Sequence, residues 1–232
     1  AYYYMSLGAN GDTIVPPRNI ELLTNARNEY LYFPNGHYGP YLFLNQNNDL
    51  IYGLVDFGRD DDVPYFDLTY SLIDTSGQVI DSIITVHRFD QTVYRDLFEV
   101  DVHGNIYFCS YVIEQDGNHP YLTKIDPEGD IIEEAFRLQP YYEDSRSYDA
   151  KAMYVDENEN VYFGIVEWSP RGTIIHGQKL NRDFEVEFDI ALCTSRGMNA
   201  KASIAGEGDE IALYCNAADE GPDQFNSALM TF

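Results

Sequence analysis

Acidic, basic and aromatic side chains gather in the loops of this chain, and these are the residues best suited to chemistry. Three of the four long loops within its repeated units are acidic, namely 58–64, 115–120 and 219–223, whereas 168–172 carries a tryptophan and an arginine. The links between the units add arginines and tyrosines. Stacking rings and charged groups together suit a polar ligand such as a glycan, and they also suit a protein loop. A solvated rim of ion pairs is the alternative interpretation.

Eight residues stand where they could contact such a ligand. Four charged ones fall at or beside the first residue of the innermost strand of a unit, where they would form a polar ring at the mouth of a central channel. The ring could bind an anionic group, or its charges could pair with one another. The single tryptophan could be a stacking platform or could cap a core. The eight are Tyr38, Tyr41, Arg95, Asp96, Tyr142, Lys151, Trp168 and Lys201.

A run of three aspartates, Asp60, Asp61 and Asp62, is the candidate metal site. Calcium prefers several oxygen ligands, and Asp56 or Asp67 could complete the set. The run lacks the alternating spacing of a dedicated calcium loop, so a solvated run of charge is the favoured interpretation. Calcium is the one cofactor that the sequence suggests.

Sequence signals for catalysis are few. The chain contains no GxSxG, HExxH or phosphate-binding loop. A pair of carboxylates could cleave a glycosidic bond, but 39 acidic residues leave no basis for selecting one pair.

Two series of turns position these loops. The first is an apolar strand end, a polar turn and a new apolar strand, and it recurs at 7–14, 73–80, 125–132 and, in a worn copy, 180–187. The second consists of Asn, Asp or Gly residues followed by an apolar pair, around 47–52, 103–107, 158–162 and 208–212. Since neighbouring copies lie about 50 to 55 residues apart in most of these intervals, one small sheet is predicted to repeat along the chain.

Alternating apolar residues between the turns predict four strands in each unit, and no segment shows a sustained helical period. The expected fold is therefore all-β, a β-propeller of four-stranded antiparallel blades with about four to five blades in this chain. It would be a single domain, 1–232, forming either a closed ring or a piece of a larger propeller. The blades are expected at 1–20 (partial), 40–86, 95–138, 150–192 and 201–232 (partial).

Charge excludes several partners. The net charge is −25, and the isoelectric point is near 4.2. Such a chain cannot neutralise a row of phosphates, which argues against nucleic acid and anionic membranes. No stretch approaches the length of a membrane span, so no membrane insertion is expected. Cations, basic proteins and neutral glycans remain compatible, and the oligomeric state stays open.

Three cysteines, Cys109, Cys193 and Cys215, give no zinc-binding spacing and no disulfide framework. Buried thiols are the favoured state, and one disulfide with one free thiol is the alternative.

The opening segment, Tyr2-Tyr-Tyr-Met5-Ser-Leu-Gly-Ala-Asn-Gly11-Asp-Thr-Ile-Val-Pro16-Pro17, resembles a repeat of secreted bacterial β-propellers. Later units, such as Asp101-Val-His-Gly-Asn-Ile-Tyr-Phe, resemble sialidase-like and NHL or SBBP-type repeats. The resemblance implies a bacterial protein that is secreted or held at the cell surface. No complete Asp-box is present, so the resemblance does not imply sialidase activity.

These patterns favour a binding or interaction module that recognises a glycan or a protein on its loop face. A carbohydrate-active enzyme, either a glycoside hydrolase or a lyase with acidic loop residues, is the first alternative. A structural repeat unit of a larger surface protein is the second.

Overall fold

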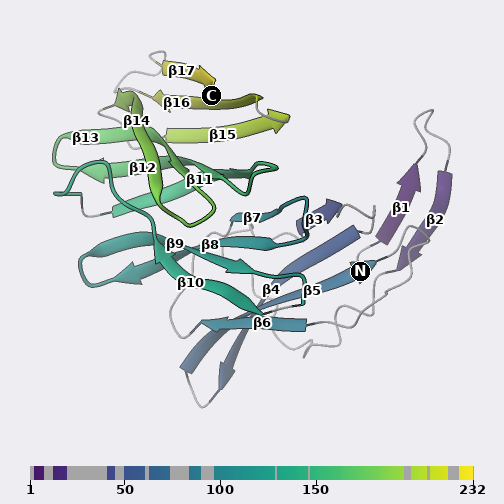
Figure 1. Ribbon diagram of the computed structural model, residues 1–232. Coiled ribbons are helices and arrows are strands. Elements are labelled where there is room, and N and C mark those ends of the chain that lie inside the picture. Colours follow the sequence, from purple (N-terminus) through teal and green to yellow (C-terminus); the bar gives the residue numbers. More distant parts are fainter. Residues whose placement is uncertain are drawn as a thin grey trace. The chain divides into compact units, whose positions relative to one another are not determined.

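A computed structural model describes the backbone of residues 3–7, 13–19, 41–44, 50–60, 63–73, 84–89, 97–128, 130–145, 147–195, 200–207, 210–218 and 225–231, and most side chains from residue 97 onward. Every regular element in these ranges is a β-strand, which confirms the all-β prediction (Figure 1). Contacts divide the chain into two compact units, Ala1–Thr92 and Val93–Phe232. Within the described ranges, no helix is long and apolar enough to cross a bilayer.

The first unit contains a hairpin and a four-stranded sheet. Strands β1 (Tyr3–Leu7) and β2 (Thr13–Asn19) pair antiparallel around the first predicted turn. The sheet runs β3-β4-β5-β6 in chain order, with every neighbouring pair antiparallel. Its strands are Tyr41–Leu44, Leu50–Asp60, Val63–Ile73 and Ile84–Phe89.

The second unit repeats this plan. Strands β7 (Leu97–Val100), β8 (Ile106–Glu114), β9 (Gly117–Ile125) and β10 (Ile131–Arg137) form one antiparallel meander. A second follows in β11–β14, and three more strands make a third, β15-β16-β17. A parallel bridge between Ser147 of β11 and Asn118 of β9 joins the first two meanders into one eight-stranded sheet, whereas the third is a sheet of its own. The strands of the last two meanders are Ser147–Val155, Val161–Ser169, Gly172–Leu180, Val186–Ser195, Ala200–Glu207, Glu210–Ala218 and Phe225–Thr231.

An aspartate holds the turn between the first and second strands of a meander. The Asp101 carboxylate accepts hydrogen bonds from the backbone N–H groups of His103 and Asn105, at 2.8 and 2.9 Å, and from the Asn105 amide and the Tyr107 hydroxyl. Gly104 adopts a φ of 88°, which glycine tolerates without steric cost. The carboxylate thus satisfies donors that the tight turn would otherwise leave unpaired.

The same turn recurs one repeat later. Asp156 accepts the equivalent four hydrogen bonds from Asn158, Asn160 and Tyr162, and Glu159 takes the left-handed position with a φ of 64°. Asn181 builds a related turn between β13 and β14, where Phe184 has a φ of 61°. Both predicted series of turns therefore fall between paired strands.

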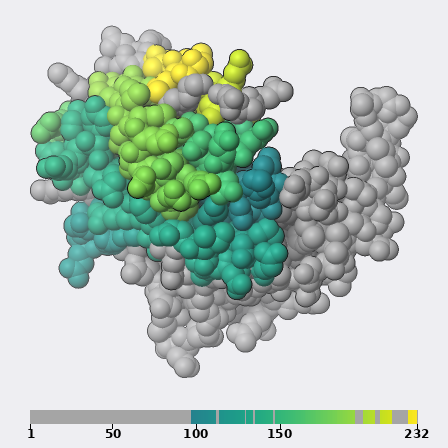
Figure 2. All heavy atoms as spheres, viewed as in Figure 1, coloured from purple at the N-terminus to yellow at the C-terminus, as the bar shows by residue number. Residues whose placement is uncertain are grey.

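The main core of the second unit lies between the meanders β7–β10 and β11–β14. Phe184 places a buried ring between Phe136 and Tyr107, with ring centroids 5.6 and 6.5 Å away. Figure 2 shows the green side chains of β11–β14 continuing the teal surface of β7–β10. The core residues include Tyr107, Cys109, Leu122, Leu138, Tyr148, Phe163 and Ile165.

A second, smaller core joins β11–β14 to the last sheet. Val166, Ile175 and Cys215 are buried there, and Trp168 and Cys193 pack against them. Gly164 permits the close approach of the two sheets, because a Cβ atom at that position would lie 2.7 Å from the Cβ of Ala202. The arrangement of all these sheets as blades of one propeller stays a prediction.

Candidate functional site

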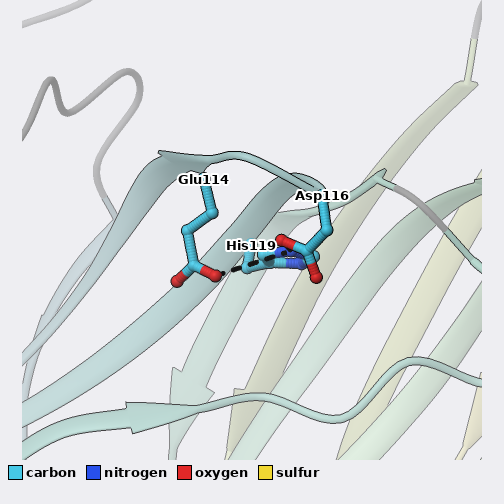
Figure 3. Close-up of side chains that lie close together, drawn as sticks. All are labelled: Glu114, Asp116 and His119. Carbon is cyan, nitrogen blue, oxygen red and sulfur yellow. Dashed lines mark hydrogen bonds and ion pairs between the residues drawn. The ribbon is translucent and has the colours of Figure 1, made fainter.

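Three side chains of the kinds that can bind metal ions lie close together at the hairpin that joins β8 to β9 (Figure 3). Glu114 ends β8, Asp116 lies in the two-residue turn, and His119 follows on β9. The Nε2 atom of His119 is 3.1 Å from Oδ1 of Asp116 and 3.9 Å from Oε2 of Glu114. One potential ligand atom of each residue lies within 4.8 Å of the others. Gly117, with a φ of 145°, closes the hairpin that brings them together.

A guanidinium and a phenol complete this cluster. The two terminal nitrogens of Arg137, at the end of β10, lie 3.9 Å from Glu114 and 3.8 Å from Asp116. The Tyr121 hydroxyl donates a hydrogen bond to the other carboxylate oxygen of Glu114. We call Glu114, Asp116, His119, Tyr121 and Arg137 the hairpin cluster. It combines two carboxylates, an imidazole and a phenol, which are groups used for acid–base chemistry, with a permanently charged guanidinium.

Exposure separates the members that can reach a ligand from the one that supports them. The side chain of His119 is 1% exposed, whereas those of Asp116, Arg137 and Glu114 are 67%, 40% and 29% exposed. The imidazole therefore lies beneath the carboxylates. It rests on the buried ring of Tyr148, with the ring centroids 5.1 Å apart.

Hydrogen bonding and burial shift the pKa values of Asp116 and Tyr121 in the cluster. The hydrogen bond from His119 is the main cause that lowers the pKa of Asp116, so this carboxyl stays ionised at neutral pH. Burial, together with the hydrogen bond to Glu114, raises the pKa of Tyr121 to about 12, so the phenol keeps its proton. The cluster thus presents an ionised base beside a protonated hydroxyl.

Two carboxylates and an imidazole could also hold a divalent cation. Arg137 already supplies positive charge to both carboxylates, and this favours an ion-paired cluster over a metal centre. The predicted calcium site lies elsewhere in the chain: Asp60 ends β4, while Asp61 and Asp62 are outside the described residues.

A second network anchors the link between β10 and β11. Glu167, on β12, is completely buried and accepts hydrogen bonds from the backbone N–H groups of Tyr141 and Tyr142 at 2.5 and 3.0 Å, and from the Ser145 hydroxyl. The buried imidazole of His176 lies 3.7 Å from Glu167 and 2.5 Å from Asp189. Three donors from a loop therefore converge on one buried carboxylate and fix the loop at this end of the sheet.

Fixing this loop presents aromatic rings to solvent. Tyr141 is 38% exposed, and its ring packs edge-on against Tyr142 at 5.0 Å. The Arg171 guanidinium lies 4.8 Å from the centre of the Tyr142 ring and also pairs with Asp144. Tyr142, a predicted ligand residue, is thus part of a stacked group beside the β12–β13 turn.

The other predicted residues are distributed as follows. Lys151 pairs with Asp149, and its ammonium lies 5.7 Å from the centre of the Trp168 ring, so the structure brings two predicted residues together. Lys201 is exposed on β15, and Tyr41 begins β3. Tyr38, Arg95 and Asp96 lie outside the described residues.

Sequence reasoning placed Asp116 and His119 in an acidic loop but did not select them, and it overlooked Glu114, Tyr121 and Arg137. The available signal was the spacing of Glu114, Asp116 and His119 across a tight hairpin. The place of Arg137 in the cluster is evident only from the strand topology, because β10 pairs with β9 and Arg137 lies opposite Tyr121.

No protein-family model matches the chain, and no curated protein matches it by sequence. Several solved structures resemble its fold. A protein of unknown function from Dyadobacter fermentans has a TM-score of 0.56 and 12% identity, over 83% of this chain and 65% of that one. The polysaccharide lyase Uly1 has a TM-score of 0.50 and 12% identity, over 82% of this chain and 48% of that one.

An ulvan lyase of polysaccharide lyase family PL25 gives a TM-score of 0.50 with 9% identity, over 83% of this chain and 51% of that one. The chain therefore spans about half the length of the two lyases that it resembles. At such low identities the likeness concerns the fold alone.

Proposed function

We propose that this chain is the β-propeller part of a carbohydrate-active enzyme and that the hairpin cluster contacts the glycan. The observation that carries the proposal is the convergence of two partly exposed carboxylates, a guanidinium and a phenol above one buried imidazole. Exposed carboxylates and guanidinium groups bind sugar hydroxyls through charge-assisted hydrogen bonds.

Asp116 is the residue that we assign to take up a proton. It is the most exposed acid of the cluster, and the hydrogen bond from His119 lowers its pKa and fixes its orientation. Its proton would come from an attacking water in hydrolysis or from a sugar carbon in elimination. Arg137 would stabilise negative charge that develops on the substrate.

The fold supports this reading in two ways. The meanders of four antiparallel strands repeat along the chain with the period expected for propeller blades. Both lyases named above act on polysaccharides by their descriptions and share the fold over most of this chain. A secreted or surface location is part of the proposal, because polysaccharides are met outside the cell.

The test is turnover of a polysaccharide panel by the full-length protein that contains this chain, with two readouts. New reducing ends report cleavage of either kind, and the ultraviolet absorbance of an unsaturated uronate reports elimination. Asp116→Asn is expected to lower turnover by about 10²-fold or more, since it removes the base. Asp130→Asn, in the exposed turn before β10, is the matched control and should leave turnover unchanged. Absence of product from every polysaccharide would overturn the proposal.

A non-catalytic glycan-binding module is the second candidate. The stacked and partly exposed pair Tyr141 and Tyr142, with Arg171 over the ring of Tyr142, favours it, because such rings bind sugars without chemistry. This candidate predicts retention on a glycan array without product formation. Binding should be lost in Tyr142→Ala and preserved in Asp116→Asn.

A further inference from the structure

Two of the three cysteines meet between sheets that share no backbone hydrogen bonds in the described part of the chain. Cys193 lies near the end of β14, and Cys215 lies in the middle of β16. Their Sγ atoms are 2.9 Å apart. Both are present as thiols, yet the sulfur atoms are closer than unbonded sulfur atoms normally pack, and a short approach would bring them to bonding distance.

The surroundings keep this pair together and apart from the third thiol. Cys215 is completely buried in the small core with Val166 and Ile175, and Cys193 is half-buried at its edge. Cys109 belongs to the other core, between β7–β10 and β11–β14. A pairing between Cys193 and Cys215 is therefore the one that the packing offers.

We propose that Cys193 and Cys215 are a disulfide site that ties the sheet β15–β17 covalently to the sheet β11–β14. In the described residues the two sheets meet through side chains such as Val166, Ile175 and Ala202, without a shared backbone ladder. A covalent bond supplies a connection that hydrogen bonding does not provide. It also closes a short loop in the unfolded chain, which lowers the entropy of that state.

The oxidant is a low-molecular-weight disulfide such as oxidised glutathione. The Cys193 thiolate, the more exposed of the two, attacks one sulfur of the oxidant and releases one small thiolate. The Cys215 thiolate then attacks the sulfur of Cys193 and releases the second. Two protein thiols are oxidised, one small disulfide is reduced to two thiols, and the two protons pass to the released thiolates.

Thiol chemistry at this site requires an oxidising setting. Burial and the neighbouring Cys215 raise the pKa of Cys193 to about 12, so little thiolate is present at neutral pH and the exchange is slow. The same burial shields the bond from reductants once it has formed. Disulfides of this kind persist in secreted proteins and not in the cytosol.

The experiment is peptide mapping of the purified complete chain after incubation with oxidised glutathione. The chain is denatured, its remaining thiols are alkylated, and it is digested without reduction. We expect one cross-linked peptide pair that contains Cys193 and Cys215, with Cys109 alkylated. If the oxidised chain is reduced with dithiothreitol before alkylation, all three cysteines should be recovered in the alkylated form.

Two variants sharpen the test. Cys109→Ala should keep the cross-link, and Cys193→Ser should abolish it while leaving the other two cysteines open to alkylation. In wild type the urea midpoint should rise on oxidation and fall back on reduction, whereas Cys193→Ser should show no such shift. Alkylation of all three thiols in the oxidised wild type, or a cross-link that includes Cys109, would overturn the proposal.

Discussion

Glu99 offers a direct test of how burial controls the stability of the second unit. It lies on the short strand β7, opposite the completely buried Tyr107. Burial raises the pKa of Glu99 from 4.5 to about 7. The folded chain therefore holds this proton more tightly than the unfolded chain, and the ionised carboxylate destabilises the fold.

The sign and the magnitude follow from linkage. Below about pH 4.5 the carboxyl is protonated in both states and has no effect on stability. Stability is lost as the pH rises through the interval from 4.5 to about 7, and the loss is complete above it. The difference between a pKa of 4.5 in the unfolded chain and about 7 in the folded chain corresponds to about 3 kcal/mol. The Gln side chain of the Glu99→Gln variant cannot ionise, so the unfolding free energy of the variant should exceed that of wild type by about 3 kcal/mol at alkaline pH.

The assay is urea unfolding of wild type and Glu99→Gln at about pH 5 and about pH 8.5. The difference in unfolding free energy should be below about 1 kcal/mol at the lower pH and about 3 kcal/mol at the higher. Glu133→Gln, at an exposed position of β10, is the matched control and should show no pH-dependent gain. A difference for Glu99→Gln that is equal at both pH values would refute the reasoning.

Three further perturbations test the scaffold. Asp101→Ala removes four hydrogen bonds and leaves their buried donors without a partner, so it should lower the unfolding free energy by about 2 to 3 kcal/mol in urea titrations. A loss no larger than that of Asp126→Ala, in a more exposed turn, would contradict this. Gly164→Ala should lower the unfolding free energy by about 1 to 3 kcal/mol in the same assay. Adding Ala202→Gly to this variant should restore part of that free energy, because it removes the Cβ atom that lies nearest to the new one. Glu167→Gln weakens the anchor of the loop 138–145, so limited proteolysis should cut this loop several-fold faster, while equal rates would show that the three donors do not hold it.

The strands could be predicted because their turns carry strong local signals. An aspartate or asparagine that accepts backbone N–H groups two and four residues later leaves a recognisable pattern, as at Asp101 and Asp156. The turn at Asn181 is the copy that departs most from this pattern. Phe184 takes the left-handed position there, and its buried ring compensates through core packing.

The candidate site was harder to predict because its members come from separate strands. Arg137 approaches Glu114 and Asp116 only through the pairing of β10 with β9. Whether an acidic residue near a loop is solvated or structural depends on burial. Glu167, near the end of β12, and Asp116, in the β8–β9 turn, are both acids beside a predicted loop, although one is completely buried and the other largely exposed. Acid-rich composition gives no means of separating these two cases.

The two ends of each meander in the second unit carry different kinds of residues. In four antiparallel strands joined in order, the first and third hairpins lie at one end, and the second hairpin and the link to the next sheet lie at the other. Asp101, Asp156 and Asn181 make nearly the same turn at the first end. The hairpin cluster and the loop held by Glu167 lie at the second end. Because the repeated turns already satisfy the backbone at one end, residues at the other are free to differ between meanders, and the candidate site lies at this variable end.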